Sequence, residues 1–266
     1  MAEIGGTVHS AEENRRQNQL TILLGYQDEI NHRVFLRKDK DLVRGKIRIA
    51  LIIGEFGTPD NELIQDFLNL NRKISVSILP GSESSKEIAR QAIEGGFEVI
   101  LQMPMEPREC PEIDPGRYTI LTTHSYDEVR KKIDLALNDL EKVQGVCNYL
   151  GGKATEDTRL MTRVVKELKK KSLFFIDKGT SQNSVAYQVA QKYGLKSANN
   201  PFYINISQSP HNGREQMERL AAIAFHKGKA IACGDYDQET ADLLKDTIGH
   251  WESRGIELVY ASELVE

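Results

Sequence analysis

The sequence predicts an α/β domain built around a parallel sheet, and two observations support this prediction. From Lys46 onward, short apolar runs rich in β-branched residues alternate with segments of helical spacing. The runs are hydrophobic throughout and do not alternate with polar residues, as is typical of strands buried on both faces. Repeated βα units form either an open doubly wound sheet or a barrel, and periodicity does not choose between the two.

Eight runs are expected to be strands: residues 47–53, 75–79, 97–103, 143–147, 173–176, 202–206, 230–233 and 256–260. The helices between them carry start signals, namely Thr58-Pro59, Ser84 with Glu87, and Ser125 with Glu128. Gly95-Gly96 is expected to end a helix. Two apolar stripes are expected to face the core: Val129, Ile133, Leu137 and Leu140, and then Leu160, Met161, Val164, Val165 and Leu168.

Composition limits the function classes. The 266 residues carry a formal net charge of -4, which argues against a nucleic-acid partner. Cys110, Cys147 and Cys233 form no CxxC pair, and the latter two are expected to be buried free thiols at strand ends. The longest apolar stretch near the start of the chain, Leu20 to Leu24, is too short to span a membrane. Residues 1–18 lack the apolar centre of a signal peptide, so a soluble protein is expected and export stays open.

Residues 1–45 break the βα rhythm. They are polar, with a short apolar stretch and then Val34-Phe35-Leu36 before a charged turn. We interpret them as an N-terminal arm or added hairpin, with a role in forming a homo-oligomer as one possibility. Residues 46–266 make up the predicted α/β domain.

Acidic residues recur where the predicted strands end. They are Glu55, Glu106, Asp177, Asp235 and Asp237. Converging carboxylates can bind a hard cation or divide acid and base roles, although each one alone is more often a helix cap or part of an ion pair. The scattered histidines show no ligand spacing, and no GxSxG, GxxxxGK or GxGxxG motif is present.

Taken in order, the strand exits resemble the divergent polysaccharide deacetylase family. The matching segments are Ile52-Ile53-Gly54-Glu55-Phe56-Gly57, Ser77-Ile78-Leu79-Pro80, Gln102-Met103-Pro104-Met105-Glu106-Pro107, Gly145-Val146-Cys147-Asn148-Tyr149-Leu150-Gly151, Phe174-Phe175-Ile176-Asp177 and Ala230-Ile231-Ala232-Cys233-Gly234-Asp235. The resemblance covers about residues 46–264. It implies a distorted (β/α) barrel of about seven strands. It also implies a divalent metal, held by Asp and His, that activates water to remove acetyl groups from amino sugars.

The chain departs from the family pattern at most of the metal-site positions. Gly54-Glu55 stands where the family shows two aspartates, Asn148-Tyr149 stands for Asn-His, and Gly234-Asp235 stands for Gly-His. Lys178-Gly179 replaces Ser-Arg, whereas Asp177 is kept. Loss of both imidazoles removes the ligands best suited to zinc, so no tightly bound cofactor is expected, or else a harder divalent cation.

The resemblance therefore assigns roles to individual positions. Glu55 and Asp177 are the candidate catalytic residues, and Glu55, Asp177 and Asp235 are the candidate metal ligands. The candidate substrate-binding residues are Glu106, Tyr149, Lys153, Lys178 and Tyr236. The expected partner is a carbohydrate, such as an amino-sugar polymer or peptidoglycan fragment. The resemblance suggests the cell envelope or periplasm, and the compartment itself stays open. Two hypotheses stay open: a catalytically impaired glycan-binding protein, or an active metal-dependent deacetylase with altered oxygen ligands.

Overall fold

The structure is a computed structural model that describes residues 6–27, 29–37, 45–54, 61–81, 83–109, 116–199, 201–205 and 212–266. The chain divides into two compact units, Met1–Gly45 and Lys46–Glu266. We describe each unit by itself. Within the described residues, no helix is both long and apolar enough to cross a membrane.

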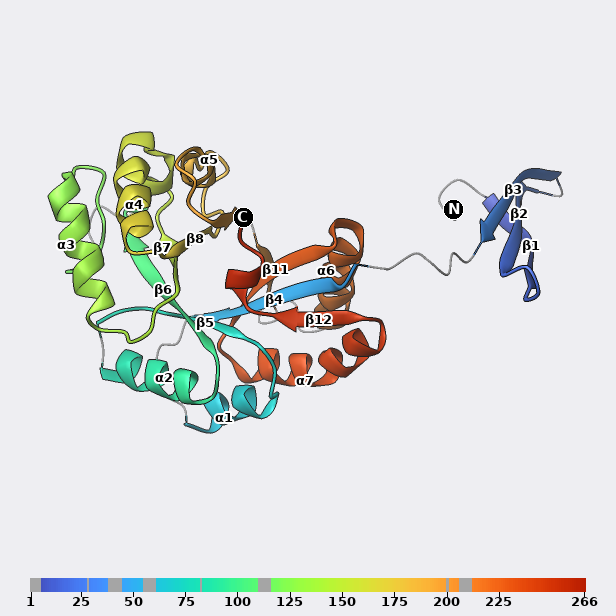
Figure 1. The fold of residues 1–266 in the computed structure, drawn as a ribbon, viewed down its shortest axis with the longest axis horizontal. Helices are drawn as coiled ribbons and strands as arrows, with labels where there is room; N and C mark the ends of the chain where they lie inside the picture. Colours follow the sequence, from blue (N-terminus) through green and yellow to red (C-terminus); the bar gives the residue numbers. More distant parts are fainter. Residues whose placement is uncertain are drawn as a thin grey trace. The chain divides into compact units, whose positions relative to one another are not determined.

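The first unit is a three-stranded antiparallel sheet in the order β1-β2-β3 (Figure 1). Its strands are β1 (Gly6–Asn14), β2 (Gln19–Tyr26) and β3 (Glu29–Arg37). The expected arm or hairpin is thus a hairpin with one further strand, because the apolar run 34–36 pairs with β2. A sheet this small buries little: Val8, Ile30 and Phe35 are 60%, 54% and 59% exposed. Self-association through this unit stays a prediction.

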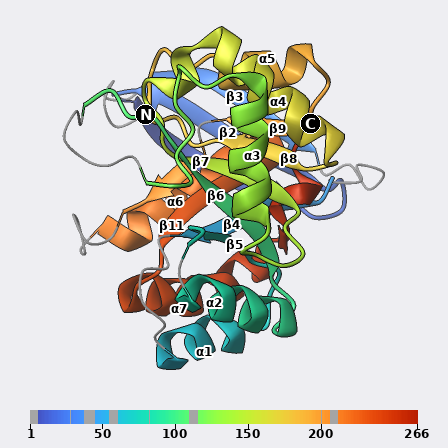
Figure 2. The same ribbon diagram turned by 90° about the vertical axis from the view of Figure 1, so that its left-hand side faces the viewer.

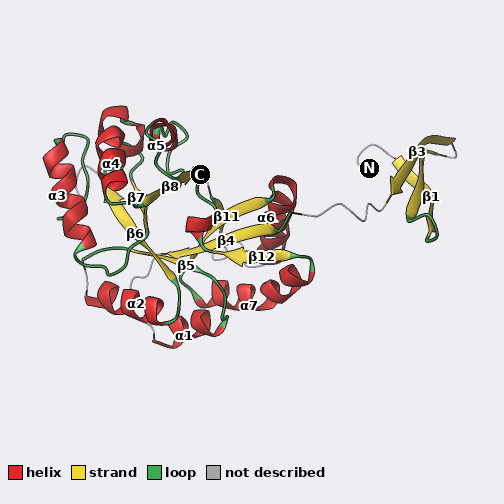
Figure 3. Ribbon diagram, in the orientation of Figure 1, coloured by secondary structure: helices red, strands yellow, loops and turns green. Residues whose placement is uncertain are grey.

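The second unit contains a nine-stranded parallel sheet, which confirms the predicted α/β class (Figure 3). The strand order is β10-β11-β4-β5-β6-β7-β8-β9, and β12 pairs with the first half of β4. The strands are β4 (Ile47–Gly54), β5 (Ser75–Ile78), β6 (Glu98–Met105), β7 (Gly145–Leu150), β8 (Phe174–Asp177), β9 (Ser197–Asn199), β10 (Phe202–Ile204), β11 (Lys229–Asp235) and β12 (Ile256–Val259).

The sheet curls because the short strands β9 and β10 follow one another directly yet pair with opposite edges. Ile176 lies opposite Ala198, whereas Cys233 lies opposite Tyr203. Asn199 and Phe202 are three peptide units apart, a span of at most about 11 Å, so the two edges of the sheet must lie close together. The resulting sheet is a distorted half-barrel with nine strands where about seven were expected. The three-residue β9, Ser197–Asn199, carries no apolar run from which it could have been predicted.

Helices cover the convex side of this sheet, and the C-terminal residues lie on its concave side (Figures 1 and 2). The α-helices are α1 (Asn61–Asn69), α2 (Glu83–Glu94), α3 (Tyr126–Leu137), α4 (Thr158–Lys170), α5 (Ala186–Lys192), α6 (Gly213–Lys227) and α7 (Gln238–Ser253), with short 3-10 helices η2 (Ala154–Glu156) and η4 (Ala261–Glu263). Both predicted stripes face the core, although Leu140 lies beyond the end of α3.

Two hydrophobic clusters result, one on each face of the sheet. The larger cluster lies between the sheet and the helices. The smaller one fills the concave side and consists of Ala50, Ile52, Ile100, Cys147, Phe174, Ile176, Cys233, Val259, Ala261, Leu264 and Val265. Successive strand residues alternate between the two clusters, so residue parity decides which side chains line the inside of the curl.

The helix ends test the predicted start signals. Ser125 caps α3 with the reciprocal capping box to Glu128, as predicted. Ser84 is not an N-cap, because α2 already begins at Glu83 and Ser84 lies within its first turn. Gly96 follows the end of α2 with φ +81°, the left-handed conformation expected of a helix terminator. Thr58-Pro59 lies outside the described residues.

Replacement of Ser125 tests whether this cap stabilises the fold. Ser125→Ala removes the acceptor of the Glu128 amide and is expected to lower the free energy of unfolding by about 1 kcal/mol, measured by urea denaturation. The control is Thr123→Ala, since the described structure shows no hydrogen bond of this hydroxyl. Equal stability of the two variants would contradict a stabilising role for the capping box.

Candidate functional site

The carboxyl ends of the parallel strands form one edge of the sheet, and the polar residues predicted from the strand exits lie along it. On the concave side, Tyr149 lies opposite Pro104, and Asp235 lies opposite Gly54. Lys178 follows β8 on the same side, two residues after Ile176 of the inner cluster. Tyr149, Lys178 and Asp235 are each partly exposed, so this rim can meet a ligand.

Asp177, the one acid kept from the family pattern, is buried, and each of its carboxylate oxygens accepts one hydrogen bond. Its Oδ2 accepts from the Ser184 hydroxyl at 2.6 Å, and its Oδ1 accepts from the Gly179 amide at 3.0 Å. Only 3% of the residue is exposed. Residues two apart in a strand point to the same face of the sheet. Because Phe175 lies in the larger cluster, Asp177 lies on the helix-facing side of β8. The carboxylate therefore holds the loop between β8 and α5.

Asn148 is a positioning residue that the sequence argument did not single out. Its buried amide donates to the Leu150 carbonyl at 2.8 Å and to Thr180 Oγ1 at 3.1 Å, and it accepts from the Lys178 amide at 2.8 Å. The Thr180 hydroxyl also donates to the Leu150 carbonyl at 2.8 Å. These bonds join the ends of β7 and β8 and hold Leu150 at φ +54°. They fix the backbone on which Tyr149 and Lys178 sit.

Glu106 and Lys153, both predicted to bind substrate, pair with each other at 2.5 Å. The other carboxylate oxygen of Glu106 accepts from the amide and hydroxyl of Thr122 at 2.6 and 2.7 Å. The Glu106 carbonyl accepts from the amides of Lys153 and Ala154. Burial raises the pKa of the Glu106 carboxyl, but the bonds from Lys153 and Thr122 outweigh it and hold that pKa below its ordinary value. Glu106 thus fastens two loops to the end of β6.

Asp235 and Tyr236 lie on opposite sides of the chain leaving β11. Asp235 accepts a hydrogen bond from the Tyr203 hydroxyl of β10. The Tyr236 ring instead stacks on Phe67 of α1, with ring centroids 5.5 Å apart, and packs against the larger cluster. Asp237, the other acid at this strand exit, caps α7 by accepting from the Thr240 amide at 2.7 Å.

The layer beneath the rim is made of neutral polar groups and thiols. The Ser77 hydroxyl donates to Gln102 Oε1 at 3.3 Å, and both residues are buried. A Cβ added to Gly54 would lie 2.6 Å from Ser77 Oγ and 3.6 Å from Gln102 Oε1. Cys147 and Cys233 are buried free thiols, as predicted. Burial raises the pKa of both, to about 12 for Cys233, although the nearby charge of Lys178 acts to lower it.

Glu55, a candidate catalytic residue and metal ligand, lies outside the described residues, and so does Cys110. Among the residues that the structure describes, no group of three His, Cys, Asp or Glu side chains is arranged to hold a metal ion. Asp177 and Asp235, the two described candidates, each accept hydrogen bonds from protein donors. The chemistry of this donor set is that of oxygen ligands without imidazole, which does not suit zinc.

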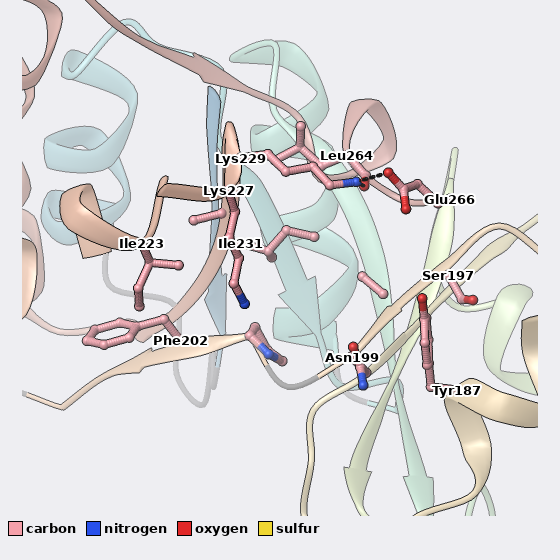
Figure 4. A pocket seen from close by; sticks show the side chains of 13 residues that line it. Tyr187, Ser197, Asn199, Phe202, Ile223, Lys227, Lys229, Ile231, Leu264 and Glu266 are labelled. Atoms are coloured by element: carbon pink, nitrogen blue, oxygen red, sulfur yellow. Dashed lines mark hydrogen bonds and ion pairs between the residues drawn. The ribbon is translucent and has the colours of Figure 1, made fainter. Parts of the chain in front are cut away.

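A separate pocket of about 300 Å³ lies where the two edges of the sheet approach each other (Figure 4). It is lined by Tyr187, Ser197, Ala198, Asn199, Pro201, Phe202, Ile223, Lys227, Lys229, Ala230, Ile231, Leu264 and Glu266. Ser197 and Glu266 exchange two backbone hydrogen bonds of 2.7 and 3.1 Å. Lys229 pairs with the Glu266 side chain and donates to the Leu264 carbonyl at 3.2 Å (Figure 4). These bonds hold residues 264–266 between the edges.

The fold and the rim together define a class of protein: a curled parallel α/β sheet with its polar groups at the carboxyl edge. Comparison with known proteins then places the chain more closely. Residues 51–265 match the model of the divergent polysaccharide deacetylase family, and the chain belongs to this family, which confirms the resemblance of its strand exits.

The relatives found by sequence are themselves uncharacterized. The chain is 30% identical over 219 residues to the uncharacterized protein YibQ of Escherichia coli, covering 82% of this chain and 67% of that protein. It is 28% identical over 198 residues to an uncharacterized protein of Haemophilus influenzae, covering 74% and 70%. The crystal structure of the uncharacterized protein ATU2773 from Agrobacterium tumefaciens is similar in fold, with a TM-score of 0.76, 23% identity and coverage of 85% and 92%.

The role of Glu106 gives a pH-dependent prediction. Glu106→Gln is expected to lower the free energy of unfolding at pH 7 by about 1–3 kcal/mol, because it weakens bonds to a charged acceptor. A carboxyl whose folded pKa is depressed stabilises the fold above its unfolded pKa of about 4.3, and this contribution is lost as the pH falls through the folded pKa. The gap between wild type and variant, measured by urea unfolding, should therefore close from pH 7 toward pH 3.

The control for this series is Glu141→Gln, an exposed glutamate for which the described structure shows no hydrogen bond. It should follow the wild type at every pH. A gap between Glu106→Gln and the wild type that does not change with pH would show that the charge on Glu106 does not stabilise the fold.

Proposed function

We propose that this chain is a deacetylase-fold protein that binds an amino-sugar glycan at the carboxyl edge of its sheet and is impaired in hydrolysis. One observation carries the proposal. Gly54 stands where the family shows an aspartate, and the Ser77 hydroxyl lies 2.6 Å from the place of the missing Cβ. A carboxylate at this position would require Ser77 to move. The neighbouring packing is thus adapted to the absence of a ligand side chain.

The hydrogen bonds of the remaining acids support the same proposal. A metal ligand or general base needs a free lone pair directed into the site. Asp177 accepts from Ser184 and Gly179, and Asp235 accepts from Tyr203. Tyr149 stands in place of a histidine, and a phenol hydroxyl is a poorer zinc ligand than an imidazole. The bonds to Asp177 and Asp235 set the orientation of both carboxylates, and with both imidazoles replaced the remaining ligand set is expected to hold zinc poorly.

The alternative is an active deacetylase that uses altered oxygen ligands, and the retained Asp177 favours it. Buried acids at strand ends are common catalytic groups, and Ser184 would then orient the carboxylate. The two functions differ in one assay. Release of acetate from an acetylated amino-sugar oligomer, abolished in Asp177→Asn, favours the enzyme. Binding of the same oligomer without acetate release favours the impaired protein.

A first test of the substituted metal site is the metal content of the purified protein. Protein purified without chelator is expected to carry far less than one zinc per chain, because oxygen ligands alone suit harder cations such as Mg²⁺ or Ca²⁺. Elemental analysis of the dialysed protein measures this. Stoichiometric zinc that is retained through dialysis and lost in Asp177→Asn would contradict the proposal.

Tyr149 and Lys178 are the proposed glycan contacts at the rim. A tyrosine ring can cover the apolar face of a pyranose, and an ammonium group can donate to its hydroxyls. Tyr149→Ala is therefore expected to weaken binding of a chitin or peptidoglycan fragment by about 1–3 kcal/mol in a calorimetric titration, with the fold intact. Tyr236→Ala is the matched control, since its ring stacks on Phe67. Tyr236→Ala should lower the stability of the fold and leave the affinity for the glycan unchanged. If Tyr149→Ala binds the glycan as tightly as wild type, Tyr149 is not a contact residue of the site.

A further inference from the structure

Gln102 carries a buried hydrogen-bond donor that has no partner. Its residue exposure is 0%, its Oε1 accepts from Ser77, and its Nε2 makes no hydrogen bond. Among the described residues, the other buried side-chain nitrogen without a partner is Nε1 of Trp251 in α7, away from the rim. An unsatisfied buried donor is costly, so in a native protein it calls for an acceptor that is bound at some stage.

The position of Gln102 links this donor to the candidate site. Gln102 lies opposite Cys147 on the concave side of the sheet. The next pair toward the carboxyl edge is Pro104 and Tyr149, both partly exposed. Gln102 is therefore one layer below the rim residue that we propose as a glycan contact.

The surroundings of Gln102 restrict the group that could pair with it. The concave side on which Gln102 lies is otherwise lined by the inner cluster, whose member Cys147 lies directly opposite Gln102, and this surface is apolar or weakly polar. A sugar hydroxyl would bring a donor of its own into this layer and leave it unsatisfied. The carbonyl of an acetamido group accepts without donating, and its methyl group suits the apolar walls.

We propose that Gln102 recognises the N-acetyl group of the glycan, with Nε2 donating a hydrogen bond to the acetamido carbonyl oxygen. This inference rests on the proposed glycan-binding function and adds a selectivity to it. A deacetylated amino sugar would place an ammonium group against the Gln102 donor and near the positive charge of Lys178, which lies close enough to act on both thiols. The site thereby favours acetylated over deacetylated glycan.

The test is titration of the whole chain with two probes of equal length, an N-acetylglucosamine oligomer and the corresponding glucosamine oligomer. Wild type should bind the acetylated oligomer more tightly. Gln102→Met keeps the side-chain length and removes the donor. It should weaken binding of the acetylated oligomer about five- to thirty-fold, as loss of one buried hydrogen bond does, and change binding of the glucosamine oligomer less than about two-fold. Gln188→Met, on the exposed surface of α5, is the control and should match wild type.

Stability provides a second readout. Gln102→Met removes the unpaired donor but also the Oε1 acceptor of the Ser77 hydroxyl, so its melting temperature is expected to fall slightly. Affinities are therefore compared at a temperature at which both proteins are fully folded, so weaker binding cannot be attributed to unfolding. Should this variant fold poorly, the side-chain amide resonance of Gln102 in the ¹⁵N spectrum of wild type replaces it, and this resonance should shift with the acetylated oligomer only.

The outcomes are distinguishable. Wild type that binds neither oligomer overturns the proposed function together with this inference. Wild type that binds the acetylated oligomer, with Gln102→Met equally tight or an unshifted amide resonance, overturns the inference alone. That result would assign the donor to a buried water molecule and leave the glycan site to the rim residues.

Discussion

The concave side of this protein exists because one short stretch of chain pairs with both edges of the parallel sheet. Ser197–Asn199 extends β8, and Phe202–Ile204, three positions on, extends β11. The connection is too short to let the edges separate, so nine strands that could lie in an open sheet must curl. The curl brings the carboxyl ends of β4, β7, β8 and β11 around one hollow side. The C-terminal residues Leu264 and Val265 then pack into the smaller hydrophobic cluster on that concave side.

At the rim, charged side chains are used mainly to hold loops. Glu106 fastens two of them, Asp177 a third, and the buried amide of Asn148 joins the ends of β7 and β8. The donors around Glu106 outweigh its burial and hold the pKa of its carboxyl below the ordinary value, so this carboxylate is less readily protonated. Beneath the rim this edge of the sheet is largely neutral, since it is made of Ser77, Gln102 and the two buried thiols.

The outcomes for individual residues show where reasoning from local sequence is effective. The strands were predictable because hydrophobic runs of buried strands are a local signal, and the cap at Ser125 was predictable because its partner is three residues away. The prediction that Ser84 is an N-cap was wrong because the local pattern is ambiguous. A Ser followed three residues later by Glu fits either an N-cap or the first turn of a helix, and α2 already begins at Glu83. Asp237 likewise caps α7 through Thr240, three residues on. The loop-holding role of Glu106 instead depends on Thr122 and Lys153, which lie 16 and 47 residues away in the sequence.

By itself the sequence determined the α/β class, the boundary near Lys46, the family, and which positions of its metal site are replaced, since these follow from the order of residues along the chain. Only the tertiary structure decided which of the replaced positions share a side. Tyr149 and Asp235 are on the concave side, Tyr236 turns to Phe67, and Gln102 lies under the rim with a donor unpaired. The physical reason is that side-chain direction in a strand changes with every residue, whereas its neighbours across a curled sheet are set by pairings between distant segments.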